Sequence, residues 1–201
     1  MISRTEARRL NARGNVIPIF TRIPADLDTP VGAFIKLAKN RPHSFLLESI
    51  EGGEKLARYS FLGFDPFMTI SGCLGEIILR QGRSKRVIDS HPAEFLKELF
   101  LIYKPVRVEE LPRFTGGGVG YFSYDAIRWL EDIPDDNPDD IELPEFHLGM
   151  YRHIVVFDHL KQEIVVIANI LHDRSEQGFD KKYSEAAATI NRIVAKLGGS
   201  R

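Results

Sequence analysis

The segment HLGMYRHIVVFDHLKQEIVVIANIL occupies residues 147–171 and decides the class of fold. Two runs rich in β-branched and apolar residues, roughly 147–157 and 162–171, flank the polar pentapeptide DHLKQ (158–162). Such runs are typical of strands, and a short polar connection between two of them predicts a β-hairpin. We expect the first strand to be amphipathic and the second, which is nearly all apolar, to be buried.

The stretch from 44 to 89 is predicted to form a run of antiparallel strands. Its strand-like pieces are separated by turn signals, among them the glycines of EGGE (51–54) and the Gln81-Gly82 pair. Apolar residues at helical spacing predict helices at 30–40, 91–103 and 175–197. A short charged helix is expected at the start, ending near Gly14, and another short helix around 125–130. Hairpins mixed with helices, without regular crossovers, favour an α+β fold of mostly antiparallel sheet flanked by helices.

Composition excludes several classes of partner. The 201 residues are 43% hydrophobic and carry a formal net charge of −1, so no global field attracts nucleic acid or an anionic membrane. No apolar run reaches the roughly 18 residues of a membrane span, and the first residues lack the apolar core of a signal peptide. A cytoplasmic location is therefore expected.

The single cysteine, Cys73, cannot form an intrachain disulfide, which fits a reducing compartment. Its neighbours Gly72 and Leu74 belong to an apolar stretch, and no base is evident nearby in the sequence. We therefore predict a buried structural thiol, not a nucleophile.

The glycines of FTGGGVGYFSY (114–124) do not predict a nucleotide site. A phosphate-binding loop needs a lysine and a serine or threonine after its last glycine, at the start of a helix. A dinucleotide fingerprint needs a helix after its glycines. Here Val119 and Tyr121 continue a strand, so the glycines are expected to allow close packing of neighbouring backbone.

Metal and catalytic constellations are missing from the sequence as well. The histidines at 147, 153 and 159 are evenly spaced, but the third falls in the predicted turn. The acidic stretch around Asp135 and Asp139 contains prolines and lacks the pattern of a calcium loop. No Ser-His-Asp order or nucleophile elbow occurs. The sequence predicts no catalytic residue, no metal site and no cofactor in this chain.

One polar pair does stand out at the end of an apolar strand. In SFLLES (44–49), Phe45, Leu47 and Ser49 are predicted to point to one face, and Leu46 and Glu48 to the other. A carboxylate and a hydroxyl in this position need hydrogen-bond partners. Either they bond the neighbouring backbone turn, or they offer acceptors to the ammonium group of a small ligand.

Four segments, in this order and spacing, resemble the large subunit of anthranilate synthase. The resemblance runs from about residue 15 to the end of the chain and is carried by several motifs together. The segments are IPADLDTPVGAFIKL (23–37), SFLLESIEGGEKLARYSFLGFDP (44–66), FTGGGVGYFSYDAIRWLEDIP (114–134) and YRHIVVFDHLKQEIVVIAN (151–169).

The resemblance implies a role in feedback control. The family converts chorismate and ammonia to anthranilate and pyruvate, and tryptophan inhibits the large subunit at a separate site. The serine of the family's LLES motif, which belongs to that site, corresponds to Ser49, flanked by Glu48 and Leu47. Arg58, Tyr59 and Ser60 match the next motif and are expected nearby, where they also have an ordinary role in packing and turn formation.

The resemblance also implies what lies elsewhere. The chorismate-binding and Mg²⁺-binding residues, and a Pro-x-Met-type segment that completes the tryptophan site, belong to a later catalytic domain. A partner glutamine amidotransferase subunit supplies the ammonia. Residues 1–201 are thus expected to be one amino-terminal regulatory domain, inactive alone. The alternatives are the same domain of aminodeoxychorismate synthase, or a stand-alone module that binds a small molecule.

Overall fold

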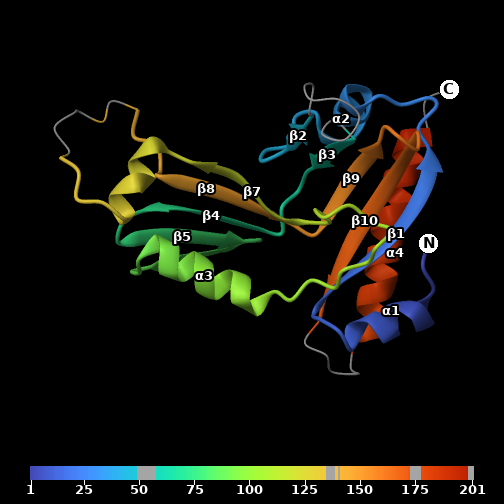
Figure 1. The fold of residues 1–201 in the computed structure, drawn as a ribbon, viewed down its shortest axis with the longest axis horizontal. Helices are drawn as coiled ribbons and strands as arrows, with labels where there is room; N and C mark the ends of the chain where they lie inside the picture. The colour runs from blue at the N-terminus through green and yellow to red at the C-terminus, as the bar shows by residue number, and fades with distance from the viewer. Residues whose placement is uncertain (49–57, 135–138, 140, 173–177, 199–201) are drawn as a thin grey trace. The chain divides into compact units, whose positions relative to one another are not determined.

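The computed structural model describes residues 1–48, 58–134, 139, 141–172 and 178–198. The chain forms two compact units. Unit 1 consists of 1–66, 104–117 and 151–201, and unit 2 of 67–103 and 118–150. Each is described separately below, with elements labelled as in Figure 1.

Unit 1 is built on a five-stranded antiparallel sheet. Its strands are, in spatial order, β1 (Val16–Pro24), β10 (Glu163–Leu171), β9 (His153–Asp158), β3 (Tyr59–Gly63) and β2 (Phe45–Leu47). The β9–β10 hairpin is the one expected from the opening segment, and Glu163 pairs with Asp158 at its turn. Strand β10 is buried along nearly its whole length, as its apolar sequence predicts.

Three helices accompany this sheet: α1 (Arg4–Asn11), α2 (Pro30–Ala38) and α4 (Phe179–Gly198). The side chains of Ser3 and Thr29 cap α1 and α2 by accepting from Glu6 N and Gly32 N, respectively, which satisfies amides that the first turn leaves unpaired. Helix α4 packs on β10 and β1 (Figure 1). Its apolar stripe, which includes Ile190 and Ile193, is buried in the core.

Unit 2 contains a second five-stranded sheet, in the order β6 (Ser84–Ile88), β5 (Glu76–Gln81), β4 (Met68–Cys73), β8 (Phe146–Tyr151) and β7 (Gly117–Phe122). Helix α3 (Pro92–Ile102) packs Leu96 into a core that includes Ile70, Ile77 and Phe146. A 3₁₀ helix, η1 (Tyr124–Trp129), follows β7. The two antiparallel sheets with flanking helices confirm the predicted α+β class.

Three sequence-based expectations are wrong: that 147–157 is one strand, that this strand is amphipathic, and that Cys73 is buried. The single strand expected at 147–157 is two strands, because the chain leaves the sheet of unit 2 at Arg152 and enters that of unit 1 as β9. The side chain and backbone of Asn169 both donate to the Arg152 carbonyl at this break. Strand β9 is largely buried, not amphipathic.

The run of strands at 44–89 is likewise divided, with β2 and β3 in one sheet and β4 to β6 in the other. Cys73 is exposed, because it lies at the last position of β4, next to the turn into β5. Apolar neighbours in sequence do not bury a residue whose strand is about to end.

Candidate functional site

Five strand ends meet at one end of the unit 1 sheet. Leu47, the last residue of β2, pairs with Phe61 of β3, and Tyr59, at the start of β3, pairs with Asp158 of β9. Asp158 in turn pairs with Glu163 of β10, and Glu163 pairs with Pro24 of β1. The predicted motif residues 47, 48 and 58–60 therefore come together at this end.

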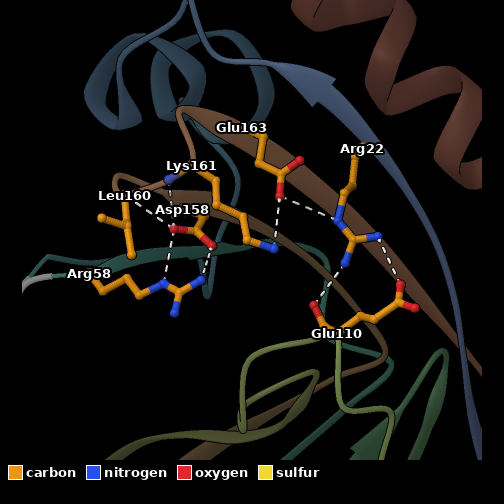
Figure 2. Close-up of polar contacts among 7 residues, drawn as sticks. All are labelled: Arg22, Arg58, Glu110, Asp158, Leu160, Lys161 and Glu163. Carbon is orange, nitrogen blue, oxygen red and sulfur yellow. Dashed lines mark hydrogen bonds and ion pairs between the residues drawn. The ribbon is translucent and has the colours of Figure 1, made fainter. Parts of the chain in front are cut away.

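A bidentate ion pair fixes the start of β3. Nε and Nη2 of Arg58 donate to the two carboxylate oxygens of Asp158 at 3.0 and 2.7 Å. The same carboxylate accepts from the backbone amides of Leu160 and Lys161, both at 3.2 Å. Figure 2 shows Asp158 between the guanidinium group and the turn amides. One side chain thus ties β3 to the β9–β10 turn.

The electrostatics of the pair follow from this geometry. Burial alone would raise the pKa of Asp158, but the hydrogen bonds from Arg58, Lys161 and Leu160 outweigh it and hold the pKa below its usual value. The hydrogen bond to Asp158 raises the pKa of Arg58. Burial, followed by the negative charge of Asp158, raises the pKa of Tyr59, whose ring lies under the Arg58 guanidinium. Arg58 and Asp158 therefore both remain charged at neutral pH.

A second group of charges continues the row. Arg22 of β1 contacts Glu163 at 3.4 Å and Glu110 at 3.5 Å, and also donates to the Glu110 carbonyl at 2.7 Å. Glu163 is shared with Lys161, 3.8 Å away. Figure 2 shows these contacts linking β1, β10 and the segment that carries Glu110. The sheet end is therefore held by paired charges on three strands, on Arg58 just before β3, on the β9–β10 turn and on the loop around Glu110.

Aromatic side chains gather on one face of the sheet beside these charges. Side chains of a strand alternate between faces, so Tyr59 and Phe61 share one, and Leu47, directly opposite Phe61, shares it too. The Phe61 ring lies 5.9 Å from that of Tyr59 and 5.5 Å from that of Phe114. Leu47 is 48% exposed. An apolar, partly open surface thus adjoins the end of β2.

Ser60 lies on the opposite face. It is buried, and its Oγ is 2.7 Å from Nε2 of His159. His159 lines a cavity of about 470 Å³ near the start of α2, together with Asp26, Asp28 and Gln162. Asp28 is itself paired with Lys36. The Ser60 hydroxyl is therefore engaged within the sheet's helix-covered side, away from the aromatic face.

The structure brings together most of the residues that the sequence singles out. Leu47 and Glu48 are exposed at β2, the edge strand among the described residues, and Arg58 and Tyr59 lie at and just before the start of the neighbouring strand. Ser49 lies outside the described residues. Sequence reasoning missed Asp158 and Phe114. Asp158 was seen only as part of a turn, because its partner Arg58 lies 100 residues away in the sequence.

No group of three or more His, Cys, Asp or Glu side chains among residues 1–48, 58–134, 139, 141–172 and 178–198 is arranged to hold a metal ion. In the same ranges no helix is long and apolar enough to cross a membrane.

Comparisons with known proteins identify relatives of the whole chain. A search against protein-family models found no match. Anthranilate synthase component 1 of Acetivibrio thermocellus is 41% identical over 188 residues, 93% of this chain and 37% of that protein. Its counterpart from Aquifex aeolicus is 36% identical over 198 residues, 98% of this chain and 39% of that protein.

A solved structure gives the same result. The crystal structure of anthranilate synthase component I from Streptococcus pneumoniae TIGR4 matches with a TM-score of 0.56 and 31% identity, over 88% of this chain and 36% of that one. The chain thus spans less than two-fifths of the length of these relatives. Since the match covers nearly all of its residues, this chain is a homologue of the amino-terminal part of anthranilate synthase component 1.

Proposed function

We propose that this chain is the amino-terminal, regulatory part of a cytoplasmic anthranilate synthase component 1 and carries half of its tryptophan-inhibition site. The whole protein would convert chorismate and ammonia to anthranilate, pyruvate and water. A glutamine amidotransferase subunit would supply the ammonia, and Mg²⁺ would bind in the catalytic domain that follows. Residues 1–201 would form a single regulatory domain in this scheme and would make no anthranilate alone.

The observation that carries the proposal is the juxtaposition at the end of β2. The exposed carboxylate of Glu48 follows directly on Leu47, whose face also carries the rings of Tyr59 and Phe61. A carboxylate beside an apolar face suits a ligand with an ammonium group and an aromatic body. Tryptophan has both, and Ser49, next in sequence, would add a hydroxyl.

The proposed site is incomplete in this chain, because the rest of it would come from the catalytic domain. Tryptophan bound across that boundary can inhibit only if it binds the inactive arrangement more tightly than the active one. An isolated 201-residue chain should therefore bind tryptophan weakly or not at all. Tight binding in calorimetry would instead favour a stand-alone ligand-binding module.

The decisive experiment uses the intact component 1 that contains this chain. Anthranilate formed from chorismate and ammonium is followed by its fluorescence, with tryptophan titrated. Ser49→Ala should raise the inhibition constant about tenfold, as expected for the loss of one hydrogen bond, and leave the reaction without tryptophan unchanged. Ser84→Ala, on an exposed strand of unit 2, is the matched control.

Each other outcome decides against part of the proposal. Unchanged inhibition in Ser49→Ala removes that residue from the mechanism. Formation of aminodeoxychorismate in place of anthranilate assigns the chain to the folate-pathway relative. Anthranilate production by residues 1–201 alone would contradict the proposal that the reaction takes place in a separate catalytic domain.

A further inference from the structure

We propose that the open edge of β7 and the exposed stripe of η1 form a docking surface for an apolar, extended segment of the catalytic part of component 1. This inference rests on the proposed function only in requiring that the chain continue into such a part. It concerns unit 2 and is independent of the tryptophan site.

The stripe follows from the geometry of a 3₁₀ helix. With three residues per turn, side chains at positions i, i+3 and i+6 lie above one another. In η1 and its C-cap these positions are Tyr124, Ile127 and Leu130, which are 87%, 37% and 76% exposed. Large side chains aligned on one side of a short helix would ordinarily face a core, and here they face outward.

The other side of η1 is anchored. The Trp129 ring packs edge-on against Phe146 at 5.5 Å, and its indole nitrogen donates to Glu145. Glu145 also accepts from the backbone amide of Leu74 at 2.9 Å. The orientation of the stripe is thus fixed by the packing of its back, so Tyr124 and Leu130 cannot both turn inward.

Strand β7 extends the apolar surface. Phe122, 53% exposed, touches the rings of Trp129 and Phe146 and lies next to the stripe in sequence. Tyr121 is also exposed and stacks on His147. Exposed apolar patches of this kind mark interaction surfaces.

The two edges of the unit 2 sheet differ in a way that points to pairing at β7. Exposed edge strands are usually protected from pairing by charged residues. The edge strand β6 has this protection, since Lys85 and Arg86 are exposed on it. The edge strand β7 reads GGVGYF and carries no charge. Among the described residues, nothing pairs with its outer side.

The occupant is inferred from length. The relatives are more than twice as long as this chain, and the matches cover 88–98% of it, so most of each relative lies outside the matched part. A strand added to an uncharged edge is held by main-chain hydrogen bonds, while flanking apolar side chains fill pockets beside it. The remaining part of component 1 is present at high effective concentration because it is on the same polypeptide.

The test compares amide hydrogen exchange in the isolated 201-residue chain and in the intact component 1. Peptides covering 117–130 should exchange at least about tenfold more slowly in the intact protein. The peptide covering β6, at the charged edge, is the internal control and should not change. Equal exchange of 117–130 in both proteins would overturn the proposal, whether or not the intact protein proves to make anthranilate.

Substitution identifies the side chains responsible. Tyr124→Ser, Ile127→Ser and Leu130→Ser are combined in the intact protein, and Leu27→Ser with Leu160→Ser, exposed in unit 1, forms the matched control. Only the first variant should lose the added protection. Circular dichroism of the isolated chain should be unaltered by either. Protection that survives the triple change, or that appears in the isolated chain as its concentration rises, would show another occupant, the latter a second copy.

Discussion

At the scale of single residues, Asp158 carries more bonds than any motif residue beside it. Its carboxylate accepts four hydrogen bonds, two from Arg58 and two from the turn amides. Its side chain is only 5% exposed and that of Arg58 31%. A largely buried carboxylate that loses its partners is costly, so this pair holds the start of β3.

We expect Asp158→Asn to lower the free energy of unfolding by about 1–3 kcal/mol, measured by urea denaturation. The amide still accepts from the turn but loses the bidentate contact with Arg58. Asp180→Asn, which removes the half-exposed partner of Arg8, is the matched control and should cost no more than about 1 kcal/mol.

The same pair predicts an acid dependence. The pKa of Asp158 is lowered in the folded chain from a reference of 3.8, so the unfolded chain takes up a proton first as pH falls. The stabilisation is therefore complete above pH 3.8 and lost as pH falls through the folded pKa. The difference between wild type and Asp158→Asn should shrink correspondingly.

Burial of His153 predicts that the free energy of unfolding also depends on pH at milder acidity. It is largely buried beside Phe64, and burial lowers its pKa from 6.5 to about 4. The unfolded chain binds the proton first, so the free energy of unfolding should fall between pH 6.5 and 4, by roughly 3 kcal/mol in total. The charges that act on it are Asp65, Arg152, Arg192 and Arg41.

His153→Leu should abolish that slope, whereas His43→Asn, at an exposed histidine, should preserve it. Urea denaturation at several pH values measures both. A slope that persists in His153→Leu would assign the titration to another group.

At the scale of elements, β7 depends on the absence of a side chain. A Cβ on Gly120 would lie 1.8 Å from the carbonyl oxygen of His147 on the neighbouring β8. Gly120→Ala must therefore push the two strands apart. We expect a loss of about 1–3 kcal/mol in thermal or urea unfolding, while Gly198→Ala, where a Cβ meets nothing within 4 Å, should cost nothing.

The elements show what sequence could and could not predict. Helical periodicity located α2, α3 and α4 because burial of one face is a local signal. Strand pairing is not local, and so the break at Arg152 was missed. The runs on both sides of it are equally apolar, and only the side chain of Asn169, 17 residues later, marks the point where the chain changes sheets.

The candidate site shows the same limit. The positions of Leu47, Glu48 and Arg58 at one sheet end follow from their place in consecutive strands of a hairpin-like run. The partner of Arg58 lies 100 residues away, and the ring against Phe61 comes from Phe114. Neither contact has a signature within any window of the sequence, because the first depends on the register of β3 with β9 and the second on where the distant segment that carries Phe114 packs.

At the scale of the whole molecule, the two hydrophobic cores share no residue. Ile190 lies in one and Leu96 in the other. The only tryptophan, Trp129, packs against the core of unit 2, whereas the longest helix, α4, belongs to unit 1. Tryptophan fluorescence therefore reports mainly on unit 2, and far-ultraviolet circular dichroism mainly on unit 1.

We expect Ile190→Ala to lower the urea midpoint seen by circular dichroism, and Leu96→Ala to lower the midpoint seen by fluorescence. Each removes a buried side chain at a cost of about 2–5 kcal/mol. Coincident shifts of both signals in both variants would show that the units unfold as one.

The pairing of β1 with β10 also has a consequence for how the chain is made. The paired residues run from Val16 with Leu171 to Pro24 with Glu163, so β1 leaves the ribosome roughly 150 residues before its partner. At about 5–20 residues per second, that delay is on the order of 7–30 s. During this delay the apolar segment VIPIF (16–20) has no partner strand. We therefore expect chaperones that shield exposed apolar segments to bind the nascent chain.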